Sequence, residues 1–438
     1  MRSLTLFFFM LSGSAVVHAQ PVLTWEAMPP LPMPTANNAV CAAEVNGVDR
    51  IYSFGGITTG LDRTNIHREA FCFDTGTGAW TTLPASPDTL CKIASAASVV
   101  DGVAYVVGGY HVLAGSPFEI SSDRVHRFDL STSTWLTDGS PIPIPIDDQV
   151  QAVWRDSLIF VITGWSNNTN VAAVQIYDPA LDAWSVGTPV PNTSLYKVFG
   201  GSGTIIGDTI LYYGGASLGS NFPAQDELRI GIIDPTNPTQ IDWQPALSTG
   251  RASYRSACGS WAGRPFWIGG SSTSYNYDAV AYNGSGVVQP GTTIAWSGSN
   301  TATLDLVPAE QAVMDLRGLG EVGEGVLHVC GGIGNNAEVL SSHWRVTSTV
   351  GMNDRLKENS LLVYPVPSTG PVTVWPNGLI GAYFYSVQDG LGKSVLEGRS
   401  SGGPFHLDLA GNAAGTYTVK LISGTSVTTG RFWLVKDL

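Results

Sequence analysis

The sequence predicts an all-β protein made of a six-bladed β-propeller followed by a small β-sandwich. Two observations predict the propeller. A strand-like run that ends in two glycines recurs at intervals of 51 to 62 residues, and an Asp followed six residues later by a Trp recurs in phase with it. One observation predicts the sandwich: seven short strand-like runs separated by turns occupy residues 361–438.

The glycine pairs end runs of aromatic and branched residues, which favour a β-strand. The runs are IYSFGG, AYVVGG, LYYGG, PFWIGG and LHVCGG, and they end at Gly56, Gly109, Gly215, Gly270 and Gly332, while a degenerate copy, IFVITG, ends at Gly164. Glycine weakens a strand interior, so we expect each pair to let the strand bend and neighbouring backbone approach closely. A phosphate-binding loop would need a helix after the glycines, and no helical period follows any pair.

The second repeated signal is an Asp that ends one strand and a Trp that opens the next. It occurs as Asp74 with Trp80, Asp129 with Trp135, Asp178 with Trp184 and, in stretched form, Asp234 with Trp243. We expect the carboxylate to accept backbone N–H groups and start a turn. We expect the indole to bury its apolar face against the neighbouring blade.

A strand, Gly-Gly, a gap, an aromatic residue with Asp, and then Trp together resemble the kelch repeat, over residues 20–347. The sequence departs from this pattern at Thr163, which replaces the first glycine of the third pair, and in repeats five and six, which lack the Asp-to-Trp signature. The resemblance implies a propeller with a ligand-binding face.

The two ends of the repeat array predict how the ring closes. The last repeat has one strand after Gly332 and then stops, whereas the chain has an unmatched strand around Trp25 before the first repeat. We expect this N-terminal strand to pair, antiparallel, with residues 338–346 in the sheet of VLHVCGG, which removes two open sheet edges.

Composition narrows the location and the partners. Residues 1–19 have the positive start, apolar core and small-residue cleavage site of a secretory signal peptide. The net charge is -13 with no basic run, which argues against binding to nucleic acid or to an anionic membrane. Apart from the signal peptide, the chain contains no apolar stretch long enough for a transmembrane helix.

Five cysteines are present in a chain expected to be exported, which allows disulfides but leaves at least one thiol free. A bond between Cys72 and Cys91 is one possibility, and the other is that all five are small buried residues. None has the C-x-x-C spacing of a zinc site, and the histidines show no ligand spacing, so no metal and no cofactor are expected.

A polar stretch at residues 348–360 reads as a linker before the β-sandwich of immunoglobulin type at 361–438. The segments VYPVPSTGPVTV, VQDGLGKSV, AGTYTVKL and RFWLVK occur there in order, and they resemble the C-terminal sorting domain of the type IX secretion system of Bacteroidetes. The family usually has Asn where this chain has Val366. The resemblance implies a secreted or cell-surface protein and the type IX machinery as a partner.

The ligand-binding face of kelch propellers is made by the loops after the glycine pairs and the loops that lead into each blade. Candidate residues on these loops are Tyr110, Trp165, Asn167, Tyr196, Lys197, Arg251 and Asn335. Aromatic rings stack on sugars and peptides, and amides pair with hydroxyl groups. The predicted function is therefore binding of a glycan or a protein.

The alternative is an enzyme, because some kelch-like propellers are sialic acid mutarotases of the N-acetylneuraminate epimerase type, which this chain resembles in blade number and signal peptide. Such an enzyme needs a carboxylate facing a cation, and Arg251, Arg255 and Glu310 are candidates by loop position. The adjacent acids Asp147 and Asp148 could act in acid–base catalysis. Adjacent residues on a strand face opposite ways, so no joint role is expected of them.

Overall fold

The computed structural model describes residues 22–261, 264–277, 283–288, 293–296, 301–304, 311–323, 325–349, 360–364, 368–377, 383–400, 404–423 and 426–436. Within these ranges nearly every element is a β-strand, and a 3₁₀ helix, η1 (Arg63–Asn65), forms one turn in a loop. None of the helical segments in the described ranges is long and apolar enough to cross a membrane.

The described part of residues 22–349 contains six antiparallel sheets of four or five strands and one two-stranded hairpin. Sheet 1 contains β2 (Ala39–Val45), β3 (Val48–Ile57), β4 (Ile66–Asp74) and β5 (Ala79–Leu83). Sheet 2 contains β6 (Ile93–Val100), β7 (Val103–Val112), β8 (Glu119–Ser121), β9 (Val125–Asp129) and β10 (Thr134–Trp135). Sheet 3 contains β11 (Val150–Trp154), β12 (Leu158–Ile162), β15 (Val174–Asp178) and β16 (Ala183–Gly187), with a hairpin of β13 (Trp165–Ser166) and β14 (Thr169–Asn170) between β12 and β15.

The remaining three sheets follow the same order. Sheet 4 contains β17 (Phe199–Ile206), β18 (Thr209–Ala216), β19 (Glu227–Asp234), β20 (Asn237–Trp243) and β21 (Leu247–Ser248). Sheet 5 contains β22 (Ala257–Trp261), β23 (Arg264–Ile268), β24 (Thr293–Trp296) and β25 (Thr301–Leu304). Sheet 6 contains β26 (Gly320–Val322), β27 (Val326–Cys330), β28 (His343–Thr349) and β1 (Val22–Met28).

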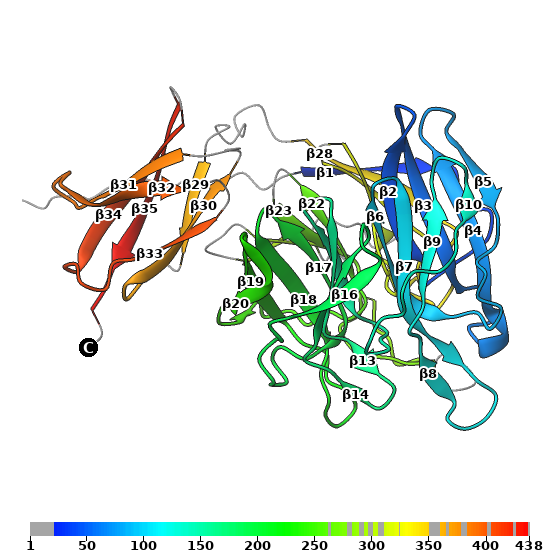
Figure 1. Ribbon diagram of the computed structural model, residues 1–438. Helices are drawn as coiled ribbons and strands as arrows, with labels where there is room; N and C mark the ends of the chain where they lie inside the picture. The colour runs from blue at the N-terminus through cyan, green and yellow to red at the C-terminus, as the bar shows by residue number, and fades with distance from the viewer. Residues whose placement is uncertain are drawn as a thin grey trace, which may run out of the picture.

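The first strands of the six sheets lie side by side in chain order. Strand β2 neighbours β6, which neighbours β11, and the series continues through β17, β22 and β26 back to β2. In Figure 1, β8, β13 and β14 lie together at the lower end of these sheets. The cores between neighbouring sheets are formed from side chains of both, as for Phe54 and Phe128, whose ring centroids are 5.5 Å apart.

The glycine pairs act through close backbone approach, as expected. Gly108 has φ 65°, a left-handed conformation, and a Cβ there would lie 2.4 Å from the carbonyl oxygen of Ile146. The next residue, Gly109, donates its N–H to that carbonyl at 2.9 Å. Ile146 belongs to the loop that leads into sheet 3, so the glycine pair joins neighbouring sheets near the centre.

The Asp and Trp of the second signal also have the expected roles. The Asp129 carboxylate accepts the backbone N–H groups of Ser131 and Thr132 at 2.8 and 3.0 Å, which forms the turn. The indole N–H of Trp135 donates to the carbonyl of Pro84, in the segment that leaves sheet 1, at 2.8 Å. Equivalent indole bonds to a preceding segment are made by Trp80, Trp184 and Trp243.

Sheet 6 is completed by the N-terminal strand. Strand β1 pairs antiparallel with β28, and Trp25 lies opposite Val346, in the same sheet as β27. The partner strand runs from His343 to Thr349, so it begins later than residues 338–346 and extends two residues into the expected linker. Strands β1 and β28, from the two ends of the repeat array, are therefore hydrogen-bonded neighbours in one sheet.

A buried histidine pair connects β27, β28 and the segment after β1. The His343 Nδ1–H donates to the Pro29 carbonyl at 3.3 Å, and its Nε2 accepts from His328 Nδ1 at 2.7 Å. Both rings are almost fully buried. Burial lowers the pKa of His328 to about 3, with the neighbouring His343 adding to the effect, and burial lowers the pKa of His343 to about 4.

This pair predicts loss of stability in weak acid. The unfolded histidines have an ordinary pKa near ~6.5, so below that pH the unfolded chain binds more protons than the folded one. Unfolding free energy should therefore fall as pH drops from about 6.5 to about 4. Urea denaturation at several pH values checks this. A double variant with His328→Gln and His343→Gln should show a shallower slope over this range, and an unchanged slope would contradict the assignment.

The C-terminal residues form two further sheets with one shared core. The first contains β29 (Ser360–Tyr364), β30 (Pro371–Asn377) and β33 (Phe405–Asp408), and the second contains β31 (Tyr383–Gln388), β32 (Ser394–Ser400), β34 (Gly415–Ser423) and β35 (Ser426–Leu434). Side chains from both sheets, among them Val374, Val419 and Phe432, pack in one cluster. Figure 1 shows these strands together at one side of sheet 4.

One side chain of this part joins a core of the first part. Trp375 of β30 is 5% exposed and belongs to a cluster with Tyr213 and Ile230 of sheet 4 and Trp267 of sheet 5. Sheet 5 lacks the Trp that other sheets carry in their outer strand, since β25 reads TATL. A tryptophan from the C-terminal part thus takes part in the core between sheets 4 and 5.

The possible bond between Cys72 and Cys91 is not formed, since all five cysteines are free. Cys41, Cys72 and Cys330 are buried, and burial raises the pKa of Cys41 to about 12. Cys91 and Cys258 are partly exposed. The three buried cysteines are the small core residues of the second possibility.

Candidate functional site

Each of the six sheets contributes one residue with left-handed backbone to the centre of the assembly. Five of these residues lie within two positions of the start of the first strand of their sheet, and the sixth lies five positions before it. All six have φ between 50° and 67°, and they are Asn37, Ala94, Asp148, Gly200, Arg255 and Asp315. Such a conformation is uncommon outside glycine, and it persists only where the surroundings hold it. The repeated conformation shows that one local structure has been used six times with different side chains.

Hydrogen bonds join these residues into a closed ring. Three backbone bonds run in series, from Asp148 N–H to the Ala94 carbonyl at 3.1 Å, from Gly200 to Asp148 at 2.8 Å, and from Arg255 to Gly200 at 2.7 Å. The amide of Leu316, next to Asp315, donates to Arg255, and Asn37 donates to the Asp315 carbonyl at 2.8 Å. The Asn37 side chain accepts the Ala94 N–H and completes the circle.

The side chains of the ring fill its centre with a buried ion cluster. Arg255 donates two bonds to the Asp148 carboxylate, at 3.0 and 2.6 Å, and a third to Asp315 at 3.2 Å. All three side chains are at most 2% exposed. A buried guanidinium held between two carboxylates in a two-pronged geometry is strongly oriented. We call Arg255, Asp148 and Asp315 the axial cluster.

Tyrosines surround the axial cluster and satisfy its remaining lone pairs. The hydroxyl groups of Tyr275 and Tyr277 donate to the two oxygens of Asp315 at 2.9 and 2.5 Å. The Arg255 guanidinium lies 5.1 Å from the ring centroid of Tyr254 and 5.3 Å from that of Tyr275. Burial opposes the charge of Arg255, but Asp148, Asp315 and the surrounding tyrosines together raise the pKa of this guanidinium above its ordinary value. Arg255 is therefore charged and fully engaged.

A pocket of about 620 Å³ opens above the axial cluster, on the side of the loops that follow the glycine pairs. Its aromatic lining consists of Tyr110, Trp165, Phe199, Phe222 and Tyr275. Its carboxyl groups are those of Glu119, Asp147 and Asp148. Amide and hydroxyl groups come from Asn221, Asn276, Asn283, Ser272, Thr273, Ser274 and Ser285. The lining combines flat apolar surfaces with hydrogen-bonding groups, which is the usual make-up of a small-molecule site.

Asp147 lies in the wall of this pocket and is only 3% exposed. Its Oδ2 accepts a short hydrogen bond, 2.5 Å, from the Ser121 hydroxyl of β8. Burial, together with the charge of the adjacent Asp148, raises the pKa of Asp147 well above its ordinary value. Buried groups with a strongly shifted pKa in a cleft are candidates for a functional role.

Two of the seven face residues named from sequence line the pocket, and a third supports its wall. Tyr110 and Trp165 are lining residues, and Tyr110 donates to the Asn276 side chain at 3.4 Å. Asn167 is exposed on the β13–β14 hairpin, where its side chain accepts the Ser121 N–H at 3.1 Å. Its own N–H donates to the Ser121 hydroxyl at 2.8 Å, so the hairpin holds the serine that contacts Asp147.

Tyr196 does not line this pocket, unlike the position expected for it. Its ring is buried between sheets 3 and 4, and its hydroxyl donates to the Gln244 carbonyl at 2.6 Å. Lys197 follows Tyr196 in the chain and is half-buried. The backbone carbonyl of Arg251 accepts a hydrogen bond from the Tyr213 hydroxyl. Asn335 is exposed on the loop after β27. None of these four is among the described residues that line the pocket.

The residues named as catalytic candidates occupy different positions relative to the pocket. Arg255 is at the centre, but it is buried and saturated by two carboxylates, so it cannot meet a substrate from the pocket side without breaking them. Glu310 lies outside the described residues. Asp147 and Asp148 both line the pocket, contrary to the expectation from strand alternation, because the left-handed φ of 50° at Asp148 interrupts the extended backbone.

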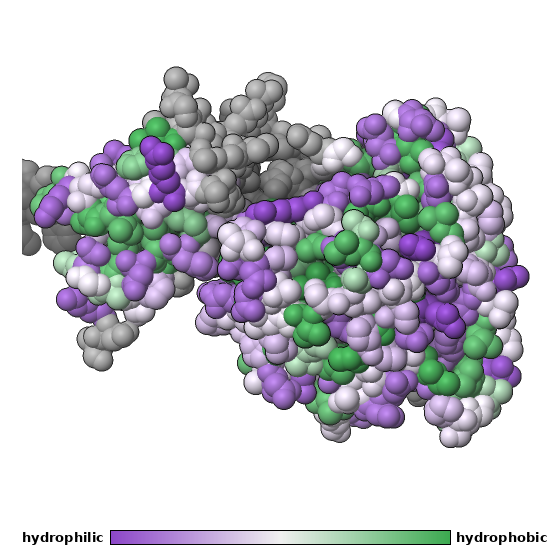
Figure 2. Space-filling model, in the orientation of Figure 1, coloured by the Kyte–Doolittle hydropathy of each residue, from purple (hydrophilic) through white to green (hydrophobic). Residues whose placement is uncertain are grey.

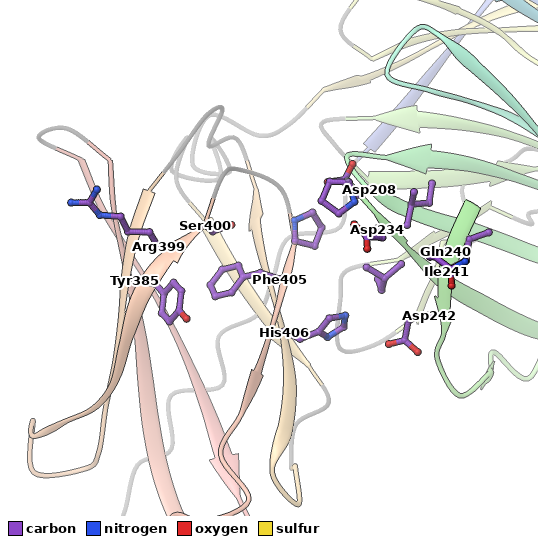
Figure 3. Close-up of a pocket in the computed structure, with 14 residues that line it drawn as sticks. Asp208, Asp234, Gln240, Ile241, Asp242, Tyr385, Arg399, Ser400, Phe405 and His406 are labelled. Atoms are coloured by element: carbon purple, nitrogen blue, oxygen red, sulfur yellow. The ribbon is translucent and has the colours of Figure 1, made fainter. Parts of the chain in front are cut away.

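A second cavity, of about 680 Å³, lies between sheet 4 and the C-terminal strands. Figure 3 shows Asp208, Asp234 and Asp242 on one wall, with Tyr385, Phe405 and His406 on the other. The acids serve local structure. Asp208 accepts from Trp154 and Arg155 at 2.9 and 2.8 Å, Asp234 accepts the turn amide of Thr236, and Asp242 accepts from Gln244. We therefore place the candidate site in the pocket above the axial cluster.

Asp315, Glu119 and Phe222 are important residues that the sequence reasoning did not select. The ring residues do carry a sequence signal, because each lies 14 to 18 residues before the first position of a glycine pair. Three of these six positions have a charged side chain in a chain with only 13% charged residues. Glu119 and Phe222 lie on long loops, and no repeated spacing identifies them.

Comparison with known proteins agrees with the geometry. The family profile of the KLHDC2/KLHL20/DRC7 Kelch-repeats domain matches residues 18–215, and a solved structure of YjhT superimposes over 74% of this chain and 99% of its own, with a TM-score of 0.55 at 16% identity. Residues 18–215 thus match kelch repeats, and the fold of the chain is that of a β-propeller. The Kelch-like protein terF of Aspergillus terreus is 29% identical to it over 167 residues, which are 36% of this chain. The match covers 35% of terF, so it spans about a third of that relative's length.

Proposed function

We propose that the six sheets are the six blades of a closed propeller and that its pocket above the axial cluster binds a glycan outside the cell. The observation that supports this most is the pocket lining, in which aromatic rings adjoin amide and hydroxyl groups. Sugar rings present apolar faces and hydroxyl edges, which these two kinds of group complement. The hydrogen-bonded ring of six left-handed residues below the pocket gives such a ligand a preformed surface to bind against.

The chemistry of the pocket favours a binding module over a sialic acid mutarotase. An enzyme acting on a carboxylated sugar needs a cation that faces the substrate. The lining residues that the structure describes include no Lys, Arg or His, and Arg255 beneath them is bound to two carboxylates. The stretches 278–282 and 289–292, which lie outside the description, read DAVAY and QPGT and contain no basic residue in sequence.

A glycan array followed by calorimetry tests the binding role. Replacing Trp165 with Ala should weaken binding of any glycan that the array identifies by about thirtyfold, near ~2 kcal/mol, because it removes an aromatic anchor. Trp433→Ala is the matched control, since Trp433 is 58% exposed on β35 of the C-terminal part. Equal losses in both variants would contradict the site. We also expect no catalysis of sialic acid mutarotation by the full chain.

The export part of the proposal comes from the chain ends. The signal-peptide pattern and the four ordered sorting motifs support passage through the inner membrane and then through the type IX apparatus. The C-terminal sheets carry exposed hydrophobic residues, including Phe384, Ile422 and Trp433. Figure 2 shows hydrophobic residues gathered over these strands. An exposed apolar surface of this kind is typical of a region that contacts another protein.

A further inference from the structure

The pocket above the axial cluster is closed at its floor. Asp148 lines the pocket, and its carboxylate is bound by Arg255, with both side chains at most 2% exposed. Arg317 lies 3.5 Å from the Asp148 Oδ1 and donates to the Gln149 carbonyl at 2.8 Å. Arg317 and Gln149 line a separate, smaller cavity of about 170 Å³. The axial cluster therefore lies between two cavities, and a ligand in the pocket cannot pass through it.

Four chain segments above this floor contribute to the lining, and each is joined to the next. They are residues 110–121, the β13–β14 hairpin, the loop 217–224 and the described part of 271–285. Two hydrogen bonds between Asn167 and Ser121, at 3.1 and 2.8 Å, join the hairpin to the first segment. The edge-to-face contact of Trp165 with Phe222, whose ring centroids are 5.7 Å apart, joins the hairpin to the loop 217–224.

The last of the four segments closes the circle. The Ser274 hydroxyl donates to the Asn221 carbonyl at 3.1 Å, which joins this segment to the preceding loop. The Asn276 side chain donates to Glu119 at 3.4 Å and accepts from the Tyr110 hydroxyl at 3.4 Å, which joins it to the first segment. Contacts between neighbouring segments therefore run all the way round the pocket.

These contacts lie near the mouth of the pocket as well as in its depth. Asn167 and Asn221 are exposed, Phe222 is 40% exposed, and Ser274 and Asn276 are half-buried. A wall joined at its rim leaves no side exit in the part that the structure describes. The pocket is thus a well with one opening, whereas a groove would let a chain enter on one side and leave on the other.

The loop that completes the wall is held in an uncommon conformation. Asn221 and Phe222 both have left-handed backbone, with φ of 59° and 46°. Such a conformation persists only where the surroundings hold it, and it is found at sites that grip a ligand. The Phe222 ring packs against those of Trp165 and Phe199, at 5.7 and 5.8 Å, and its N–H donates to the Gly219 carbonyl at 3.2 Å. These contacts keep the wall in place before a ligand arrives.

We propose that this well binds the terminal residue of a glycan, at its non-reducing end, and excludes the interior of a chain. This proposal rests on the glycan-binding function above and specifies which part of a glycan is bound. An interior residue has neighbours on both sides and needs two exits, whereas a terminal residue needs one. Glycans on proteins, lipids and surfaces are attached through their reducing ends, so the non-reducing end is the one that can enter.

The size of the well agrees with this ligand. Its volume is about 620 Å³. Sites for small molecules have volumes of about 300–1,000 Å³. The well therefore takes a short terminal segment, and the rest of the glycan extends into solvent through the single opening.

The decisive measurement is binding of the full chain to an array of disaccharides immobilised through their reducing ends. Their terminal residues are glucose, galactose, mannose, fucose, xylose, N-acetylglucosamine or N-acetylgalactosamine, and each is presented both uncapped and capped by each of the other sugars in turn. The chain should bind the uncapped glycans that end in the recognised residue. It should bind their capped forms at least about tenfold more weakly, whichever sugar forms the cap, because the cap turns a terminal residue into an interior one.

Phe222→Ala tests the wall itself. Removing this ring breaks the contact with Trp165 and opens a side exit between the hairpin and the loop 217–224, so the variant should lose most of the preference for uncapped glycans. Leu218→Ala is the matched control, because Leu218 lies on the same loop, is 53% exposed and is not among the described lining residues. The quantity compared is the ratio of uncapped to capped affinity, which a general loss of affinity does not change.

The outcomes separate this proposal from the glycan-binding function. Equal or tighter binding of the capped glycans by the unaltered chain would overturn the proposal and leave glycan binding intact. An unchanged ratio in Phe222→Ala, or an equal change in Leu218→Ala, would show that the preference does not come from this wall, and it would also overturn the proposal. If neither the capped nor the uncapped glycans bind, the glycan-binding function itself fails, and the proposal fails with it.

Discussion

An Arg255→Met variant should lose about 3–5 kcal/mol of unfolding free energy, the largest effect expected from any single substitution in the propeller. Arg255 is 1% exposed and is the cation shared by Asp148 and Asp315, which are equally buried. Without this guanidinium, Asp315 loses its ion-pair partner, and Asp148 keeps only Arg317, at 3.5 Å, in a site with little access to water. Methionine keeps much of the volume, so the loss comes from uncompensated charge and not from a cavity.

Urea denaturation monitored by tryptophan fluorescence measures this loss. Arg345→Met is the matched control, because Arg345 pairs with Glu26 at 2.9 Å while both side chains are exposed, by 41% and 58%. An exposed pair of this kind contributes about 1 kcal/mol or less. If the two variants lose the same free energy, the axial cluster is no more important than a surface ion pair.

A further variant tests whether Arg255 stabilises the fold by compensating buried charge, even if Arg255→Met alone does not fold. Adding Asp315→Asn alone removes the carboxylate that loses its cation and retains a similar shape, while Asp148 keeps the buried Arg317 at 3.5 Å. This double variant should be more stable than Arg255→Met alone, since the uncompensated carboxylate is gone. The reverse order of stability would show that the guanidinium acts through its tyrosine contacts, such as that with Tyr254 at 5.1 Å.

The repeats of the propeller could be predicted because each signal is local. A glycine pair is needed where Gly108 would otherwise collide with Ile146, and the Asp129 turn forms within four residues of sequence. The unmatched strand around Trp25 also led to its partner β28, since an unpaired strand and an incomplete sheet must meet. Periodicity and local hydrogen bonding were enough for these features.

The candidate site was less predictable because it depends on contacts between residues far apart in the chain. Arg255 is 107 positions from Asp148, and nothing in the local sequence of either predicts the pair. The strand-alternation rule failed at Asp148 because its backbone is left-handed there. Tyr196 was misplaced for a related reason, since a loop tyrosine can turn its ring inward when a carbonyl such as that of Gln244 accepts its hydroxyl.

The C-terminal part is expected to be dispensable for folding of the propeller but required for its export. Strand β1 already completes sheet 6, so the propeller has no missing strand for this part to supply. The structure adds one contact that matters, the inclusion of Trp375 in the core between sheets 4 and 5. Removing it exposes part of that cluster, so a truncated chain should unfold cooperatively at a somewhat lower temperature.

The test is a truncation after Val350, which retains the whole of β28, expressed in a Bacteroidetes host with an intact type IX apparatus. The truncated protein should be folded and held in the periplasm, whereas the full chain reaches the surface or the medium. Cell fractionation shows where each form is, and calorimetry of the purified proteins shows whether the transition stays cooperative. A full-length Trp375→Ala variant separates the two proposed roles, because it weakens the contact but keeps the C-terminal segments that resemble sorting motifs, and it should still be exported. Equal surface delivery of the truncated and full chains would contradict the sorting role, and loss of a cooperative transition on truncation would show that the propeller needs this part to fold.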